Sequence, residues 1–473
     1  MINCPFYRLL GSRYNAAQLG IGYITSTLNA AGHDAWTYNA DYISEDKYKN
    51  VQGLFDEYHN YKEYFEKPDE HQIWDEVVNK ILEFQPDWVG WFCYTASVPA
   101  IKILSKKLKE KNPAIRQVVG GPHSSMDREL LNRLPDIDFS VVREGEQCML
   151  RLVNGDAPKT IRGVISRTLL GLLQNGDADF LDRDILPYPE REKFWGLTEE
   201  EKLTVDVSYI IRTISCPYDC SYCASPFAWG RKTQMRSNES IISEAKLVKE
   251  KYWNRTVHKD YSASANATPK NSLVIKSNEI LYFVDDIFPL KKRGFIPLMD
   301  AFVKEKLNIP WKCESRADLL DEEICLKMQE AGCQMIKIGF ESASDRILKQ
   351  ISKRETRQDY INCANILKKV GMKVGCYFMI GFEDEHDADV DETISFAKSL
   401  YDLGVVKYFS LSILSPYYGT PIYFDAVSRG YDLDDDSAWN LFYHQTGDLM
   451  INKYISKQKV QEFLDLGKLN DYM

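Results

Sequence analysis

Three cysteines stand close together near the middle of the chain. Cys216, Cys220 and Cys223 lie in the segment Ile214-Ser-Cys-Pro-Tyr-Asp-Cys-Ser-Tyr-Cys223, with CxxxCxxC spacing. Thiolates are the ligands of iron–sulfur clusters, and a four-iron cluster held by three protein cysteines keeps one iron free for a small molecule. Zinc sites usually combine two CxxC pairs, so a zinc loop fits this spacing less well than a cluster does. A few unconnected thiols fit it less well too. The spacing therefore predicts a 4Fe-4S cluster with an open iron.

The residues before the cysteines predict a β-strand. The run from Val205 to Thr213 is β-branched and aromatic, so the cysteines should lie on the loop that leaves a strand end. In parallel α/β folds, reactive groups gather at the carboxyl ends of strands. Further strands, separated by helical patterns such as 322–331 and 357–370, are expected at Ile280–Val284, Trp311–Glu314, Met335–Phe340, Val374–Ile380 and near Val406. Six parallel strands are predicted in this half.

The N-terminal part also alternates between helix and strand patterns. Helices are expected over 19–31, 72–84 and from Ser97 and Glu144, with strands over 35–38, 87–94, 117–121 and 137–142. This alternation predicts a doubly wound parallel sheet of the Rossmann-like kind. Such sheets bind ligands at their carboxyl ends, where Tyr94-Thr-Ala-Ser97, Gly120-Gly121 and Arg143-Glu-Gly-Glu146 stand. From spacing alone, an ordinary strand-to-helix turn is the favoured explanation of Gly120 and Gly121.

These patterns divide the α/β chain into four parts. Residues 1–152 are expected to form the Rossmann-like domain, 153–204 a linker, 205–425 a barrel-like domain with a polar insertion at 254–278, and 426–473 a helical tail. The linker region loses periodicity and includes the proline-bearing run from Ile185 to Arg191.

Composition limits the classes of function. The chain has 473 residues, 44% hydrophobic and 27% charged, which is ordinary for a globular protein, and a net charge of −10 argues against broad nucleic-acid binding. No segment reads as a signal peptide or a membrane span. Eleven cysteines are expected in a reducing cytoplasm. A small-molecule or peptidic substrate is predicted, with no membrane partner.

Together with later segments, the cysteine loop resembles the radical SAM superfamily. The family binds S-adenosylmethionine (SAM) through the open iron of the cluster, in a partial (β/α)6 barrel. The matching segments are Asp285-Asp286, Glu314-Ser-Arg-Ala-Asp318, Gly339-Phe-Glu-Ser342 and Met379-Ile-Gly-Phe-Glu-Asp-Glu385. The resemblance implies that SAM is bound by Tyr222, by one of Asp285 and Asp286, and by Arg316, Glu341, Ser342 and Gly381. Two departures stand out: Glu383-Asp384 replaces the family's Pro-Gly, and Ile214-Ser215 replaces Arg-Gly.

Strand alternation places Glu341 on the inner face of the barrel. Ile336, Ile338 and Phe340 share one face of the strand, while Lys337, Gly339 and Glu341 share the other. We expect the apolar set to face the helices, which leaves Glu341 as an unpaired carboxylate that a ligand would satisfy.

The N-terminal segments "DWVGWFCYTAS", "VVGGPHSS" and "VVREGE" resemble the cobalamin-binding domain that precedes many radical SAM barrels. The resemblance implies that Thr95, Ser97, Gly120, Gly121, Glu144 and Gly145 hold cobalamin. Domains that ligate cobalt through histidine carry DxHxxG near the first strand, and here no histidine precedes His33. Cobalamin is therefore expected to be base-off, without a histidine ligand. His444-Gln-Thr-Gly447 matches HxxG by spacing only and is read as incidental.

The resemblance implies a cobalamin-dependent enzyme that cleaves SAM to a 5′-deoxyadenosyl radical and methylates an unactivated carbon. A reductant such as flavodoxin or ferredoxin would supply the electron. Some relatives instead close rings, rearrange carbon skeletons or insert sulfur. An RNA methylthiotransferase would need a second cluster, for which Cys4, Cys93 and Cys148 are the candidates, and a basic C-terminal module. A non-catalytic cobalamin or redox sensor is the other alternative, although it would not require the SAM-like segments.

Overall fold

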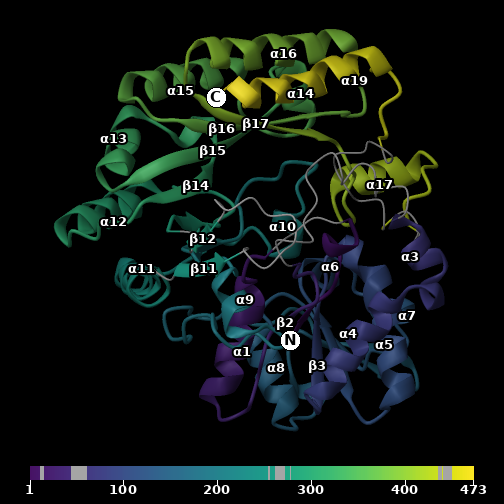
Figure 1. Cartoon of the computed structure of the whole chain (residues 1–473). Helices are drawn as coiled ribbons and strands as arrows, with labels where there is room; N and C mark the ends of the chain where they lie inside the picture. The colour runs from purple at the N-terminus through teal and green to yellow at the C-terminus, as the bar shows by residue number, and fades with distance from the viewer. Residues whose placement is uncertain are drawn as a thin grey trace. The chain divides into compact units, whose positions relative to one another are not determined.

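The computed structural model describes residues 1–10, 15–43, 61–253, 256–260, 272–276, 279–434, 439 and 450–472. The chain divides into two compact units (Figure 1). Unit 1 comprises Met1–Ser208 and Leu247–Glu279, and unit 2 comprises Tyr209–Lys246 and Ile280–Met473. Across the described ranges, no helix is both long enough and apolar enough to cross a membrane.

A seven-stranded sheet with the order β2-β1-β3-β4-β5-β6-β7 forms the centre of unit 1. Its strands are β1 (Ile2–Asn3), β2 (Tyr38–Asn39), β3 (Trp88–Phe92), β4 (Arg116–Gly120), β5 (Phe139–Val141), β6 (Val164–Thr168) and β7 (Gly171–Gln174). The first five run parallel, as predicted, whereas β6 and β7 add an antiparallel hairpin. The segment predicted as a linker without regular elements thus contains two strands. Neither strand shows an alternating pattern: β6 begins with three buried residues and ends exposed, and β7, at the sheet edge, has no buried residue.

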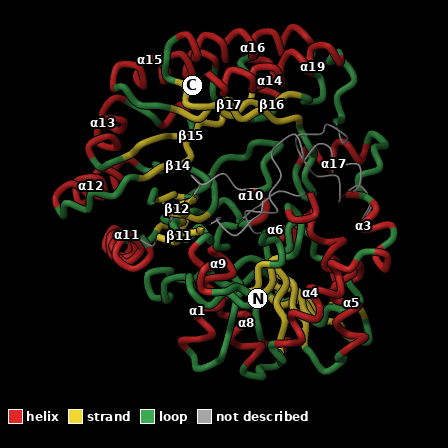
Figure 2. The backbone as a smooth tube through the Cα atoms, in the orientation of Figure 1, coloured by secondary structure: helices red, strands yellow, loops and turns green. Residues whose placement is uncertain are grey.

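Helices lie on both faces of this sheet, which confirms the doubly wound arrangement. α1 packs against α8, and α4 packs against α5. Figure 2 shows the first pair on one side of the strands and the second pair on the other. The helices are α1 (Leu19–Ala30), α3 (Glu63–Glu66), α4 (Gln72–Glu83), α5 (Val98–Lys111), α6 (Pro122–Met126), α7 (Leu130–Arg133), α8 (Glu146–Val153) and α9 (Glu199–Leu203).

The predicted polar insertion at 254–278 contains two paired strands. β11 (Thr256–Asp260) runs antiparallel to β12 (Ser272–Lys276), following the long helix α11 (Asn238–Tyr252). Other residues of the insertion lie outside the described ranges.

Unit 2 is built on a six-stranded parallel sheet with the order β17-β16-β15-β14-β13-β8, which confirms the six predicted strands. They are β8 (Tyr209–Ile210), β13 (Leu281–Phe283), β14 (Trp311–Ser315), β15 (Cys333–Glu341), β16 (Val374–Ile380) and β17 (Val406–Ile413). Figure 1 shows helices along the outer face of β14 to β17. These are α12 (Lys292–Lys304), α13 (Glu322–Glu330), α14 (Asp345–Gln350), α15 (Arg357–Val370) and α16 (Asp387–Asp402).

The alternation predicted for β15 is confirmed on its outer face. Ile336, Ile338 and Phe340 are fully buried, as expected for side chains packed under the helices. The helix α15, expected over 357–370, begins with a capping box between Thr356 and Asp359 and ends at Gly371 in the left-handed region.

The strand predicted before the cysteines is divided in two. β8 ends at Ile210, and β9 (Thr213–Ile214) pairs antiparallel with β10 (Gln234–Met235) in a separate small sheet. The break follows from Asp285, whose carboxylate accepts hydrogen bonds from the backbone N–H groups of Arg212 (2.8 Å) and Thr213 (2.7 Å). The cysteines therefore follow β9 rather than a barrel strand, with the short helix α10 (Ser225–Ala228) after them.

The C-terminal segment covers the edge of the barrel sheet. The helices described after α17 (Pro421–Ser428) include α19 (Lys457–Leu464) and a 3-10 helix, η8 (Asp465–Tyr472). The Asn470 side chain accepts from the N–H of Phe409 (2.8 Å) and donates to its carbonyl (3.1 Å), so it satisfies backbone groups of the edge strand β17. Residues His444–Gly447 lie outside the described ranges.

Candidate active site

A cavity of about 340 Å³ lies inside unit 2 at the carboxyl ends of the barrel strands. The cysteine loop, β14 to β17 and the loop after α14 contribute to its lining. Seven residues predicted from the sequence line it: Cys216, Cys220, Cys223, Tyr222, Asp286, Arg316 and Glu341. The fold therefore brings the predicted cluster cysteines and most of the predicted SAM residues to one place.

Contacts from distant segments hold the cysteine loop. The N–H of Ser221 donates to the carbonyl of Ile351 (2.9 Å), and Arg354 forms an ion pair with Asp219 (2.7 Å). Ser215, directly before the first cysteine, has a φ of 74°, a conformation that ordinary residues adopt rarely and that often marks functional sites.

The three thiols are mostly withdrawn from solvent. Cys216 and Cys220 are buried and Cys223 is partly exposed, while burial raises the pKa of Cys216 to about 11 and that of Cys223 to about 12. A metal that binds thiolates displaces these protons. In the described part of the chain, no three His, Cys, Asp or Glu side chains form a group that could hold one metal ion. A four-iron cluster spaces its ligands more widely than a single ion, so three thiols around one cavity fit a cluster in their type and placement.

The two adjacent aspartates have different surroundings. Asp285 is buried beneath the cysteine loop, where it accepts the two backbone hydrogen bonds described above, and burial raises its pKa to about 7. Asp286 lines the cavity and accepts a hydrogen bond from the Ser225 hydroxyl (2.7 Å). Asp286 is thus the aspartate that faces the cavity, and Asp285 shapes the loop.

Glu341 faces the cavity but has a partner, which corrects the expectation of an unpaired carboxylate. The Lys353 ammonium donates to it over 3.3 Å, and both side chains are almost completely buried. Burial alone would lower the pKa of Lys353, but the carboxylates of Glu341 and Glu355 raise it. Glu341 also has a φ of 59°, where a register shift interrupts the pairing of β15 with β16.

Arg316 is neither a free carboxylate ligand nor half of a surface ion pair. Its Nε and one terminal nitrogen both contact the Asp318 carboxylate (3.0 and 3.1 Å), and that terminal nitrogen also donates to the Lys353 carbonyl (2.8 Å). Its guanidinium stacks on Tyr218 at 3.8 Å from the ring centre. The guanidinium N–H groups that would bind a carboxylate of SAM therefore already donate to groups of the protein.

Ser342 and Gly381 do not line the cavity. The buried Ser342 hydroxyl accepts from the N–H of Ser344 (3.2 Å). Gly381, with a φ of 100°, starts a loop in which the buried Glu385 carboxylate accepts from the N–H groups of Gly381 (2.7 Å) and Phe382 (3.2 Å). Asn452 closes this loop from the C-terminal segment by donating to the Glu383 and Glu385 carbonyls.

Among the cavity residues, sequence reasoning missed Lys353, Glu314, Lys337 and Tyr377, and it also missed Glu385 in the loop that starts at Gly381. Lys353 lies between Ser352 and Arg354, both of which have positive φ (56° and 59°), so a strained loop presents its side chain. The only sequence signal was a lysine in the short connection after an apolar helix, and such lysines are usually solvated. The acidic run at 383–385 pointed to Glu385 only weakly, because adjacent carboxylates are usually exposed.

In unit 1, the predicted cobalamin residues lie at the carboxyl ends of β3, β4 and β5, but several are engaged with their own chain. The Thr95 hydroxyl lies 3.0 Å from Nδ1 of the fully buried His123. The Ser97 hydroxyl bonds the N–H (3.1 Å) and the carbonyl (2.8 Å) of Tyr94, so Ser97 occupies the cap position of α5 without a capping hydrogen bond. The Glu144 carboxylate pairs with Arg183, and burial raises its pKa to about 7.

The three glycines of this edge differ in what they accommodate. Gly121 has a φ of 122°, and a Cβ there would lie 2.7 Å from the Cys93 carbonyl. A Cβ on Gly145 would lie 2.9 Å from the Ile24 side chain. A Cβ on Gly120 would make only ordinary contacts, the nearest at 3.8 Å. Close packing against backbone therefore explains Gly121, whereas the Ile24 side chain could move away from a Cβ on Gly145 and Gly120 has space beside it.

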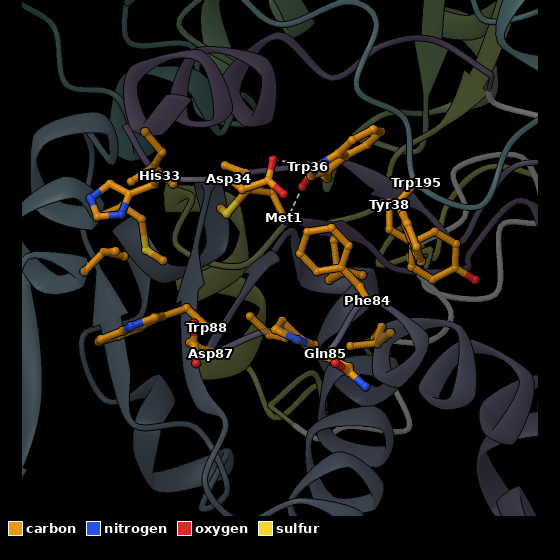
Figure 3. Close-up of a pocket in the computed structure, with 18 residues that line it drawn as sticks. Met1, His33, Asp34, Trp36, Tyr38, Phe84, Gln85, Asp87, Trp88 and Trp195 are labelled. Atoms are coloured by element: carbon orange, nitrogen blue, oxygen red, sulfur yellow. Dashed lines mark hydrogen bonds between the residues drawn. The ribbon is translucent and has the colours of Figure 1, made fainter. Parts of the chain in front are cut away.

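A separate cavity of about 340 Å³ in unit 1 lies elsewhere, beside Met1 and the start of β3. Figure 3 shows aromatic rings around it, Phe84 and Tyr38 on one side and Trp88 on the other. Trp36 donates its ring N–H to Asp34 (2.9 Å), and Trp195 donates to the Lys80 carbonyl (2.9 Å). None of the predicted cobalamin residues lines this cavity.

Comparison with known proteins identifies both halves of the chain. Residues 210–397 match the Radical SAM superfamily, and residues 11–153 match the B12 binding domain. The chain is a B12-binding radical SAM enzyme. An uncharacterized methyltransferase of Pyrococcus horikoshii is 27% identical to this enzyme over 85% of the chain and 82% of its own length. The anaerobic magnesium-protoporphyrin IX monomethyl ester cyclase of Rubrivivax gelatinosus is 26% identical over 68% of the chain and 56% of its own length.

A solved structure shows the same fold. The radical SAM methyltransferase TsrM of Kitasatospora setae, solved with cobalamin and a [4Fe-4S] cluster bound, superposes with a TM-score of 0.63. The comparison covers 90% of this radical SAM enzyme and 74% of TsrM at 16% identity. At that identity the likeness establishes the fold, while the activity has to be argued from the residues.

Proposed function

We propose that this enzyme methylates a carbon of a small-molecule or peptidic substrate with SAM and cobalamin. The observation that carries the proposal is the barrel cavity, where three thiols of one loop face the buried Glu341–Lys353 pair. A sensor that used the cluster only structurally would not need that charged lining. The methyltransferase name of the Pyrococcus relative supports methyl transfer.

The chain's own residues hold, orient and shield the reactants. Cys216, Cys220 and Cys223 would hold a 4Fe-4S cluster, and Asp286, Glu341 and Lys353 would offer hydrogen bonds to SAM. When bound, these cofactors supply a 5′-deoxyadenosyl radical and a transferable methyl group. Part of the lining, including Cys216, Cys220 and Glu341, is buried, which would limit the access of water to these groups. An external one-electron reductant such as flavodoxin or ferredoxin in the cytoplasm belongs to the same proposal.

Cobalamin would bind at the carboxyl ends of β3 to β5 without a histidine on cobalt. Gly120 is the glycine there with room for a ligand, and Thr95 lies beside it on the next strand end. His123 is fully buried and lies against Thr95, so it does not face outward from this edge. Electron paramagnetic resonance of the cob(II)alamin form should show no nitrogen superhyperfine splitting. Splitting from a nitrogen ligand would contradict the base-off, histidine-free arrangement.

Anaerobic reconstitution followed by product analysis tests the function. With a reductant, SAM labelled in its methyl group and extracts of candidate substrates, we expect 5′-deoxyadenosine and a product that carries the label. Label-free products with a new ring would instead favour cyclisation, the reaction named for the Rubrivivax relative. Formation of neither 5′-deoxyadenosine nor any labelled product would reject the proposal.

An RNA methylthiotransferase is less well supported by the structure. Its second cluster would need Cys4, Cys93 and Cys148. Cys4 and Cys93 follow the neighbouring strands β1 and β3, whereas Cys148 lies on α8 with its thiol directed at the Arg162 carbonyl. Iron near eight atoms per chain, instead of about four for one cluster, would revive this alternative.

A further inference from the structure

The inward face of the barrel is polar well below the cysteine loop. Five side chains, which we call the floor cluster, lie on the inward positions of β13 to β17: Tyr282, Glu314, Lys337, Tyr377 and Tyr408. Barrel interiors are ordinarily filled by branched apolar residues. Three members, Glu314, Lys337 and Tyr377, line the same cavity as the cysteines. A polar layer in this position needs a functional explanation because buried polar groups are costly without partners.

Lys337 is the central member of the floor cluster. Its ammonium donates to the Tyr282 hydroxyl (2.6 Å), which in turn donates to the Glu314 carboxylate, and Glu314 lies 3.6 Å from the ammonium. The ammonium also lies 4.2 Å from the centre of the Tyr282 ring. These contacts fix the position of the charge and engage at most two of its three N–H donors.

A pair of phenols lies beside this lysine. The hydroxyls of Tyr377 and Tyr408 are 3.1 Å apart, and the Lys337 ammonium is 5.9 Å from the Tyr377 ring centre. Gly375 permits this arrangement, since a Cβ there would lie 2.7 Å from the Tyr408 ring. One hydroxyl donates to the other, so the pair has one O–H left to donate. Within the described contacts, the floor cluster therefore has one spare N–H and one spare O–H.

The charge of this region favours an anion. Lys312 lies against the Tyr282 ring (4.8 Å) and adds a second ammonium, so two cations stand against the single carboxylate of Glu314. Glu314 is half-exposed and shared between Tyr282 and Lys337. Asp286, the next carboxylate in the lining, is held by Ser225. Two spare donors beside a net positive charge match the two oxygens of a carboxylate.

We propose that the floor cluster binds a carboxylate group of the substrate, with Lys337 and the Tyr377–Tyr408 pair as donors. The proposal rests on the function proposed above and adds the chemical class of the substrate. Lys337 and Glu341 are four residues apart on β15, which is about 13 Å along a strand. A substrate anchored at the floor cluster by its carboxylate extends from there towards the SAM residues.

Binding of matched carboxylates and amides tests the proposal on the reconstituted enzyme under anaerobic conditions. The probes are acetate, benzoate and phenylacetate, each paired with its neutral amide, and the measurement is calorimetric titration. We expect carboxylates of this series to bind about tenfold more tightly than their amides, because an ammonium discriminates between a charged and a neutral acceptor. The proposal is overturned if no carboxylate binds better than its amide.

Matched variants test which side chains produce the preference for carboxylates over amides. Lys337→Met should abolish the carboxylate preference, and Tyr377→Phe, which keeps the ring, should reduce it several-fold. Lys327→Met also removes an ammonium from unit 2, but from an ion pair on α13 outside the cavity lining, so it should leave the preference intact. An unchanged preference in Lys337→Met, or an equal loss in Lys327→Met, would show that the floor cluster is not the site. If Lys337→Met does not fold, a comparison of Tyr377→Phe with Lys327→Met decides the question.

The binding readout also separates this inference from the proposed function. Failure of the wild-type enzyme to form 5′-deoxyadenosine would reject the radical chemistry while leaving a measured carboxylate preference in place. Turnover of SAM with no preference for carboxylates would reject the floor cluster alone.

Discussion

The two predicted cofactor sites of this enzyme use polar side chains in opposite ways. In the barrel of unit 2, charged side chains from strands and from the loop after α14 line one cavity and pair with one another, as Glu341 and Lys353 do. At the carboxyl edge of β3 to β5 in unit 1, the polar groups mostly bond to their own neighbourhood, as Ser97 does to Tyr94. Gly121 there is required by its packing against the Cys93 backbone.

This difference indicates how each site would recognise its ligand. Side chains that converge on a cavity bind through charge and direct hydrogen bonds, so single substitutions should have large effects on binding. At an edge where the side chains already have hydrogen-bond partners, a ligand would bind through complementary shape and backbone groups. Its affinity should therefore depend on the conformation of the loops. The following experiments test this contrast, beginning with the largest expected effect.

Replacement of all three loop cysteines should remove the cluster completely. In the triple Cys216→Ala, Cys220→Ala, Cys223→Ala variant, we expect no bound iron–sulfur cluster and no SAM cleavage, because no other ligand set is present on the loop. The fold should survive, since the loop is also held by Ser221 and Asp219. Iron analysis and circular dichroism measure both outcomes. Iron and SAM cleavage that persist in this variant would make the central assignment wrong.

Removal of the Glu341 charge should weaken SAM binding by at least about tenfold, because a charge-assisted hydrogen bond contributes roughly 1.5–3 kcal/mol. Glu341→Gln keeps the shape of the side chain, and equilibrium binding of SAM to the reconstituted enzyme is the measurement. Glu330→Gln, in the exposed Lys327–Glu330 pair, is the control and should have no effect. Equal SAM affinities in wild type and Glu341→Gln would contradict a role for this carboxylate.

Loss of the partner lysine should act on stability as well. Lys353→Met leaves the Glu341 and Glu355 carboxylates buried without their shared cation. Breaking one side of a buried ion pair typically costs about 3–5 kcal/mol, so the free energy of unfolding should fall by that order. Urea denaturation measures it. A change below ~1 kcal/mol would show that solvent reaches the pair, as at an exposed site.

The adjacent glycines of unit 1 provide a matched pair. Gly121→Ala should lower the free energy of unfolding by roughly 1–3 kcal/mol, because it combines a positive φ with a Cβ against the Cys93 carbonyl. Gly120→Ala has room in the protein and should leave stability nearly unchanged, but it should weaken cobalamin binding if the ligand lies against that backbone. Thermal unfolding and a cobalamin titration separate the two effects. Normal cobalamin affinity in Gly120→Ala would place the ligand elsewhere.

The buried Glu385 should make stability depend on pH. Burial raises its pKa to about 8 from an ordinary value of 4.5, so the folded state binds a proton that the unfolded state releases between these values. Protonated Glu385 contributes this stability fully below about pH 4.5, and the contribution is lost as the pH rises through about 8. Its size is on the order of a few kcal/mol. Relative to Glu385→Gln, the wild type should lose stability across this range. If the stability of the two proteins changed with pH in parallel, this contribution of Glu385 would be excluded.

The sequence by itself determined most of the elements and the type of chemistry. Cysteine spacing, the alternation of helix and strand patterns and the inward face of β15 are local properties, and each appears in the structure where the pattern placed it. Local patterns failed where an element had no apolar repeat, as in β7, and where a distant side chain redirected the backbone, as Asp285 does between β8 and β9.

Only the tertiary structure decided which polar groups meet. Lys353 and Glu341 lie on different elements, and Lys337 joins Tyr282 and Glu314 from neighbouring strands. The sequence could not show that Arg316 is occupied by Asp318, or that Gly121 is required by Cys93. The physical reason is that electrostatic and packing energies depend on distances through space, and the fold alone brings these residues within reach of one another.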